Sequence, residues 1–388
     1  MIAPASAPAA YDLAPLLAIV AFGALLALLP FAWVWRRDRR LGLAARLRAL
    51  TVLTLFLTFD LVLFGAFTRL TDSGLGCPDW PGCYASASPL GATEQIAAAQ
   101  TALPSGPVTP HKAWIEMIHR YLATGVGALI SILAVLSWVA ARRRLLPISP
   151  WWATATLVWV CVQGAFGALT VTMKLYPAIV TAHLLGGLAL LVLLAAQLEA
   201  DRRAPVALPA GLRSAAIAIA LLSVAQIALG GWVSTNYAVL ACSDFPTCQG
   251  SWWPAMDFEH GFALQRALGE GKGGGFLPFA ALTAIHYAHR LGAYVVLLAM
   301  AWFAWRLWAS GEAALRPWAR AVAGVALWQL ASGFSNVVLG WPLIGAVGHT
   351  AGAAAWVTLL ALLLTRSRRA AAMPARQRSS GQALRAAP

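Results

Sequence analysis

Four histidines recur at matched positions in two halves of the chain. His119 is repeated by His289 and His183 by His349, at nearly the same separation along the chain. Each falls inside a long apolar run, where ionisable residues are costly and usually functional. Imidazole is a ligand for iron, copper and zinc. The pattern therefore indicates one metal-binding site in each half, although any single histidine of this kind is more often only a hydrogen-bonding group.

The expected depth of the four histidines narrows the choice of metal centre. Each is expected about five to eight residues inside one end of its helix, so at about 1.5 Å rise per residue they share one depth. Two imidazoles from two helices, with nothing else nearby to coordinate, suit a flat cofactor bound on both faces. That cofactor is haem. We predict one haem between His119 and His183 and another between His289 and His349.

Residues near the histidines are predicted to serve the same cofactor. Three of the four histidines are followed, three residues later, by a glycine that would leave room for a macrocycle, with close helix packing as the alternative. These glycines are Gly186, Gly292 and Gly352. Three arginines near the same end are predicted partners of the haem propionates, unless they only extend toward the membrane surface. These arginines are Arg69, Arg120 and Arg290.

The two halves differ three residues before the first histidine of each pair. The N-terminal half has Glu116 before His119, and the C-terminal half has His286 before His289. Residues spaced i, i+3 share one helix face, and a carboxylate there can relay protons or orient a substrate. We predict that the N-terminal site does chemistry, with Glu116 as its catalytic residue, and that the C-terminal site moves electrons. A Glu116 that only hydrogen-bonds is the alternative.

Composition places these sites in a membrane protein. Of 388 residues, 60% are hydrophobic and 11% are charged, whereas about a quarter are charged in a soluble domain. Only helices and closed barrels span lipid, and the apolar runs are too long for barrel strands. We predict an all-α integral membrane protein with nine transmembrane helices. The runs are 14–36, 49–70, 114–140, 151–172, 178–200, 213–234, 281–305, 318–340 and 342–365.

A repeated loop motif shows that the chain is a duplicated unit. Cys-x-Asp-aromatic-Pro-x-Cys occurs at Cys77 to Cys83 and again at Cys242 to Cys248. We predict two pseudo-symmetric four-helix bundles and one extra N-terminal helix. The divisions are 1–48 (extra helix and basic linker), 49–200 (the half predicted to do chemistry), 201–369 (the half predicted to move electrons) and 370–388 (a basic tail expected to be disordered).

The net charge of +14 does not indicate a nucleic-acid partner, because 21 of the 28 Lys and Arg fall in alternate connections and in the C-terminal tail. This bias predicts a multi-pass protein of the inner membrane, with the N-terminus and Cys loops periplasmic and the C-terminus cytoplasmic. Close cysteine pairs outside the cytoplasm usually oxidise, so we predict one disulfide in each loop. A four-Cys zinc site is the alternative, although zinc sites favour shorter spacings.

Several motifs, in order along the chain, resemble the haem A synthase family of proteobacterial type. They are Thr68-Arg69-Leu70-Thr71, Gly74-Leu75 with the first Cys motif, Glu116-Met117-Ile118-His119-Arg120, Thr181-Ala182-His183, the second Cys motif with Gln249-Gly250, and His286-x-x-His289-Arg290. The resemblance covers about residues 49–365. The chain departs from the family in its extra helix at 14–36, since family members commonly have eight.

The resemblance implies oxidation of the C8 methyl of haem O to the formyl of haem A, for terminal oxidases. His119 and His183 would hold the substrate haem O and product haem A, with Glu116 essential nearby, and His289 and His349 would hold a permanent haem b that supplies electrons. Further partners would be the haem O synthase and oxidase assembly factors. A di-haem transmembrane cytochrome b that only carries electrons is the alternative, and a haem transporter is a third.

Overall fold

Nine long helices make up most of the part of the chain that the structure describes. This computed structural model describes residues 13–37, 42–145, 149–200 and 205–372, and within them nine helices are long and apolar enough to cross a membrane. All nine predicted spans are thereby confirmed. The helices are α1 (Ala14–Arg37), α2 (Leu43–Leu70), α4 (Pro110–Arg142), α5 (Trp151–Thr172), α6 (Pro177–Ala200), α7 (Ala210–Thr235), α9 (Phe279–Ala309), α10 (Arg316–Val338) and α11 (Leu343–Ala372).

Several helices extend beyond their apolar runs. α4 begins at Pro110 because Thr109 caps it, its hydroxyl accepting the backbone N–H of Lys112 at 3.3 Å; Ser and Thr are favoured N-caps, and proline suits the first turn. At the other end of the chain, α11 continues to Ala372. The helix thus includes residues 370–372, the start of the tail that was expected to be disordered. Residues 373–388 lie outside the described part of the chain, so the expectation for the tail stays a prediction.

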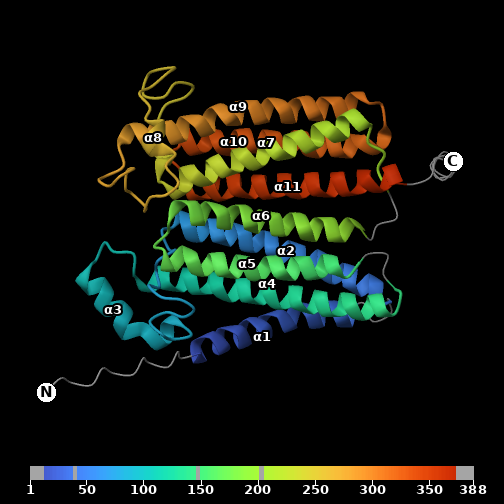
Figure 1. Ribbon diagram of the computed structural model, residues 1–388, viewed down its shortest axis with the longest axis horizontal. Coiled ribbons are helices and arrows are strands. Elements are labelled where there is room, and N and C mark those ends of the chain that lie inside the picture. The colour runs from blue at the N-terminus through green and yellow to red at the C-terminus, as the bar shows by residue number, and fades with distance from the viewer. Residues whose placement is uncertain (1–12, 38–41, 146–148, 201–204, 373–388) are drawn as a thin grey trace.

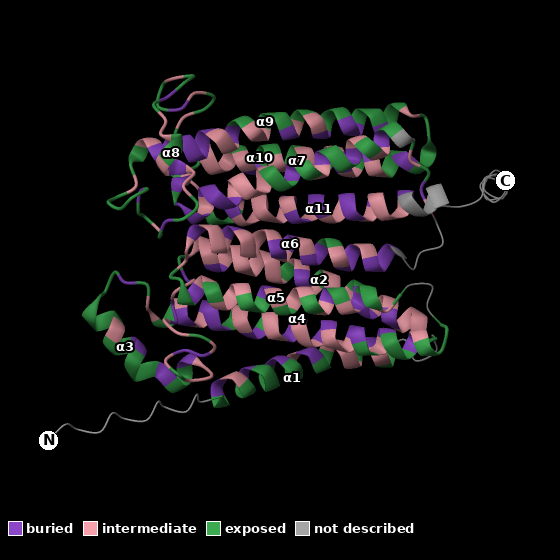
Figure 2. Ribbon diagram, viewed as in Figure 1, coloured by how far each residue is buried: buried purple, intermediate pink, exposed green. Residues whose placement is uncertain are grey.

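The long helices pack side by side with their axes roughly aligned, and they form a row that extends from α1 at one end to α9 at the other (Figure 1). Within the N-terminal half, α2 packs on α4, α4 on α5, α5 on α6 and α6 on α2; within the C-terminal half, α7, α9, α10 and α11 pack in the same cyclic order. α6 and α2 meet α7 and α11 between the halves, and α1 packs mainly on α4. Figure 2 shows exposed residues along α1 and α9, which lie at the two ends of the row.

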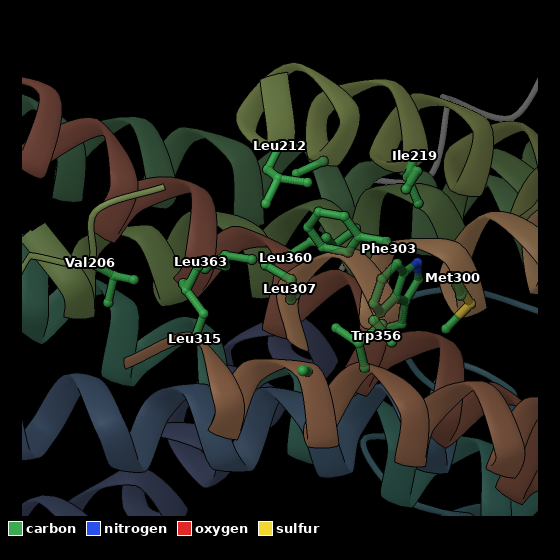
Figure 3. Close-up of a cluster of buried hydrophobic side chains, with 14 of the residues drawn as sticks. Val206, Leu212, Ile219, Met300, Phe303, Leu307, Leu315, Trp356, Leu360 and Leu363 are labelled. Carbon is green, nitrogen blue, oxygen red and sulfur yellow. The ribbon is translucent and has the colours of Figure 1, made fainter. Parts of the chain in front are cut away.

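The apolar core of each half is concentrated at one end of the helices. In the C-terminal half it is built from the starts of α7 and α10 and the later turns of α9 and α11, with Phe303, Leu307 and Leu363 fully buried (Figure 3). In the N-terminal half, Leu50, Leu129 and other core residues occupy the same end. The opposite end carries both Cys motifs, and we call it the disulfide end. The apolar side chains leave space for a cavity at this end of the helices.

The two Cys loops have the same construction. Disulfides join Cys77 to Cys83 and Cys242 to Cys248, as predicted. Among the described residues, no group of three or more His, Cys, Asp or Glu is arranged to hold a metal ion, so the four-Cys zinc alternative is not supported. Asp79 and Asp244 stabilise the turns inside the loops by accepting backbone N–H groups. The first loop leads into the short helix α3 (Thr93–Ala102), and the second contains α8 (Phe258–Gly261).

Candidate functional site

The four predicted ligand histidines all line one cavity of about 1300 Å³. His119 lies on α4 and His183 on α6, close enough to interact electrostatically. His289 on α9 and His349 on α11 form the equivalent pair in the other half. Within each half the two histidine-bearing helices are opposite members of the ring of four. The structure therefore brings the histidines together in the pairs that were predicted, all within the first half of their helices.

Each imidazole lies against a glycine of a neighbouring helix. A Cβ atom added to Gly65 on α2 would lie 3.1 Å from Cε1 of His119, and one added to Gly167 on α5 would lie 3.7 Å from Cε1 of His183. The corresponding distances in the C-terminal half are 2.9 Å for the glycine of α7 and 3.3 Å for that of α10. An added Cβ would therefore clash with the ring at the α7 glycine and crowd it at the glycines of α2 and α10, whereas at Gly167 it would make an ordinary van der Waals contact. These four glycines are Gly65, Gly167, Gly230 and Gly333.

The predicted role of another set of glycines is not supported. A Cβ on Gly186 would lie 2.0 Å from Nε2 of Gln163, and one on Gly292 would lie 2.2 Å from Oε1 of Gln226. A Cβ on Gly352 would likewise clash with the side chains of Trp328 and of a third glutamine. Among the residues that line the cavity, none of these three glycines is included. They leave room for glutamine side chains between helices, which is the close-packing alternative, and not for a macrocycle.

The histidines of the two halves differ in what their second ring nitrogen contacts. In the C-terminal half, Nδ1 of His289 lies 2.9 Å from the Gln226 amide, and Nδ1 of His349 lies 2.9 Å from the Ser332 hydroxyl. In the N-terminal half, Nδ1 of both His119 and His183 is buried and, among the described residues, without a hydrogen-bond partner. This asymmetry was not predicted from the sequence.

The repeat explains this difference. When the two halves are aligned on the glycines beside the rings, Leu61 on α2 takes the position of Gln226 on α7, and Phe166 on α5 takes the position of Ser332 on α10. Neither a leucine nor a phenylalanine side chain can hydrogen-bond to an imidazole nitrogen. Partners on the second nitrogen orient a ligating imidazole and raise its basicity, so the C-terminal pair is the better prepared to hold a group permanently.

Two of the predicted propionate partners anchor the Cys loops. Arg120 donates to the backbone carbonyls of Pro81 (3.0 Å), Gly82 and Asp79 (3.1 Å). Arg290 donates to four carbonyls of the second loop, including that of Asp244 at 2.9 Å. Arg120 lines the cavity and Arg290 does not. The expected contact of Arg290 with a propionate is therefore not supported.

Arg69 connects the two halves at the disulfide end. Its guanidinium donates to the backbone carbonyl of Ser234 on α7 at 2.6 Å, pairs with Asp72 at 3.2 Å and lies 4.1 Å from the ring centroid of Tyr237. The hydroxyl of Tyr237 in turn donates to Asp72 at 2.6 Å. Arg69 also lines the cavity, and its role as a propionate partner stays a prediction.

Glu116 links the first Cys loop to the cavity. The residue is only 4% exposed, one carboxylate oxygen accepts the backbone N–H of Cys77 at 2.8 Å, and the other accepts from Arg120. His286, at the equivalent position, instead has Nδ1 3.0 Å from the carbonyl oxygen of Ala238. Both residues line the cavity. Among the described residues that line the cavity, Glu116 is the only Asp or Glu.

Comparison with known proteins agrees with this geometry. Residues 48–363 match the family described as cytochrome oxidase assembly protein (COX15-CtaA). The chain belongs to this family. The matched residues contain both histidine pairs and both Cys loops but not α1. The resemblance to a known family that the motifs indicated is confirmed.

Curated relatives with the name "Heme A synthase" match most of the chain. One from Shewanella oneidensis is 38% identical over 308 residues, which is 78% of this chain and 91% of the relative. One from Rhizorhabdus wittichii is 27% identical over 343 residues, 81% of this chain and 90% of the relative. A third, from Methylobacterium nodulans, is 30% identical over 336 residues, 76% of this chain and 84% of the relative.

Proposed function

We propose that this protein is a haem A synthase, an oxidoreductase that converts the C8 methyl of haem O to the formyl of haem A. The substrate haem binds between His119 and His183, and a resident haem b binds between His289 and His349. The observation that supports this assignment is the different surroundings of the two pairs. Hydrogen bonds to Nδ1 suit a permanent cofactor in the C-terminal half, whereas rings without such partners suit a haem that must enter and leave.

The residues of both pairs fit a haem. All four imidazoles face one cavity, and none of the described residues forms a third ligand set with them. Iron binding through Nε2 requires the proton on Nδ1, for which the Ser332 hydroxyl is a suitable acceptor. Gln226 would accept the corresponding proton of His289 with its amide oxygen, an atom that has no partner in its present orientation among the described residues. When bound, haem supplies the redox chemistry, and the protein positions it.

Glu116 is the residue we assign to proton handling. The reaction proposed is successive hydroxylation of the methyl group with dioxygen as the oxidant: each hydroxylation would consume one O2, two electrons and two protons and release one water, and the twice-hydroxylated carbon would then lose water to give the formyl group. Protons must therefore be delivered beside the substrate. Glu116 lines the cavity next to His119 and is held by Arg120 and the backbone of Cys77. A carboxylate in hydrogen-bond reach of a substrate can accept and return a proton. Its fixed position would also orient the haem edge to be oxidised.

Electrons would pass from the C-terminal haem to the N-terminal one, because Glu116 would place the proton-coupled chemistry at the N-terminal site. The cavity reaches both pairs, and Arg69 crosses between the halves above it. We place the protein in the inner membrane with the disulfides on the periplasmic side, which agrees with an oxidising compartment and with the distribution of Lys and Arg. The haem O synthase and oxidase assembly factors are the partners that this function requires.

Pigment analysis of the purified protein tests the proposal. The wild type should contain one haem b per chain together with variable amounts of haem O or haem A, separated by extraction and chromatography. His349→Ala should lose the low-spin b spectrum, and His119→Ala should lose haem O and haem A while keeping haem b. Two identical, non-exchanging haems in the wild type would instead identify an electron carrier. An unaltered b spectrum in His349→Ala would refute the ligand assignment.

A further inference from the structure

A groove extends from the cavity along α4 in the N-terminal half. Its floor is α4 and its walls are α1 and α5, and we call it the lateral groove. The residues that line it are Val20, Ala24 and Leu28 on α1, Ala123, Gly127 and Ser131 on α4, and Cys161 and Gly164 on α5. It begins beside His119 and Arg120 and reaches Ile132, a length of about 18 Å along the helix.

Small residues keep the lateral groove open. A Cβ atom on Gly127 or Gly164 would have no other atom within 4 Å. Ala123, Ser131 and Cys161 add little bulk to the same surface. Neither glycine is explained by close packing against a neighbouring helix, in contrast to Gly65 or Gly186, where another side chain occupies the space.

The equivalent surface of the C-terminal half carries large residues. When His119 is aligned with His289, Gly127 and Ala128 on α4 correspond to Leu297 and Leu298 on α9. When Gln163 is aligned with Gln329, Cys161 and Gly164 on α5 correspond to Leu327 and Leu330 on α10. Leu298, Leu327 and Leu330 are each more than half exposed, at 71%, 67% and 51%. The surfaces beside the two proposed haem sites therefore differ in the bulk of their side chains.

The extra helix α1 forms one wall of the lateral groove. It approaches α4 closely because Gly23 has no side chain, and a Cβ there would lie 2.5 Å from Thr124. At the disulfide end, Phe22 packs edge-on against Tyr121 at 4.8 Å, and Ile19 joins the cluster around the first Cys pair. α1 lies outside the family match and, in the described part of the chain, has no counterpart beside α9. It therefore serves the N-terminal half alone.

We propose that the lateral groove binds the isoprenoid tail of the haem O substrate, and that α1 supplies one wall of this tail site. This inference rests on the proposed function. Haem O differs from protohaem by a long apolar hydroxyethylfarnesyl chain, which must leave the macrocycle at one edge. The groove is largely apolar and runs from the histidine site along α4. At the matched positions, the half assigned to haem b, which has no such tail, carries leucines in place of small residues.

Haem selectivity of the full-length protein tests this proposal without an activity assay. Purified protein in phosphatidylcholine nanodiscs is loaded with equimolar haem O and protohaem, and the bound pigments are extracted and separated. Gly127→Leu should lower the preference for haem O over protohaem about tenfold, as expected when a tight apolar site is overfilled, and should still bind protohaem. Ala24→Phe should lower the preference similarly from the α1 side.

Matched controls exist for both variants. Gly324 on α10 is also a helical glycine with nothing within 4 Å of an added Cβ, and it does not line the cavity, so Gly324→Leu should leave the preference unchanged. Ala18 is exposed on another face of α1, so Ala18→Phe should behave like the wild type. The b spectrum of the C-terminal site reports folding in every variant.

The outcomes separate this inference from the proposed function. Wild-type preference in both Gly127→Leu and Ala24→Phe would overturn the tail site. The tail site would also be overturned if these variants lost a co-purified phospholipid while keeping the wild-type preference for haem O over protohaem. That result would identify the groove as a lipid-binding site. If His119→Ala keeps its haem O, the proposed function itself is wrong. Loss of haem O in His119→Ala with wild-type behaviour of both groove variants refutes the groove alone.

Discussion

Replacing Ser332 by alanine tests whether hydrogen bonds behind the histidines distinguish the two sites. Ser332 Oγ lies 2.9 Å from Nδ1 of His349, and Phe166 is its equivalent in the other half. Ser332→Ala leaves a buried N–H without a partner, which costs about 1–3 kcal/mol. Since each 1.4 kcal/mol is about tenfold in affinity, haem b binding should weaken roughly 10- to 100-fold, the range usual for second-shell partners of metal ligands.

The assay is titration of haem-depleted protein with protohaem, followed through the low-spin b absorbance, together with a redox titration. The midpoint potential should rise, because the lost hydrogen bond made the imidazole more basic and so favoured ferric iron. Ser335→Ala is the matched control, since the Ser335 hydroxyl donates to the backbone carbonyl of Ser332 at 2.8 Å and forms no hydrogen bond to a ring nitrogen of any described histidine. Equal affinity and potential in wild type and Ser332→Ala would refute the reasoning.

Three further predictions follow from the site and its loops. Glu116→Gln should keep haem in both sites but stop haem A formation, because the amide cannot exchange the proton; normal haem A levels would contradict the assigned role. Leu61→Gln combined with Leu122→Gly reproduces the Gln226 and Gly292 pair of the other half. It should give His119 a partner and slow the release of haem O about tenfold, as measured by transfer to apomyoglobin, with Leu122→Gly alone as the control. The Thr247 hydroxyl and nearby backbone N–H groups lower the pKa of Asp244 to about 2. The stabilising effect of the Asp244 carboxylate is therefore fully present above its unfolded pKa of about 3.9 and is lost only as pH falls through about 2. Protease resistance of the second loop should be constant from about pH 4 to 8. In Asp244→Asn it should be reduced over this whole pH range.

The helices and the histidine pairs were predictable because each depends on a local or repeated pattern. Runs of apolar residues define membrane spans, and the duplication pairs His119 with His289 without any knowledge of contacts. Glu116 stood out because its repeat position holds His286. The exact start of α4 was missed because Thr109 and Pro110 extend it past the apolar run into the polar end.

The surroundings of the rings were not predictable from one helix at a time. The regular spacing of Gln163 and Gly167, repeated twice in the chain, was visible, but only the packing shows that the glycine faces a histidine and that Gly186 faces a glutamine. The missing partners of Nδ1 could have been found by asking which residues replace Gln226 and Ser332 in the first half. That comparison requires knowing that these side chains reach across to another helix.

Each of the four histidines lies near the disulfide end of its helix, six to ten residues after the first residue of that helix. If iron is held there in both halves, an electron moving from one centre to the other travels parallel to the bilayer and crosses almost none of the transmembrane voltage. Moving a charge across the whole membrane would cost or release about 2.3 kcal/mol per 100 mV. The electron-transfer step between the two centres should therefore be insensitive to how strongly the cell energises its membrane.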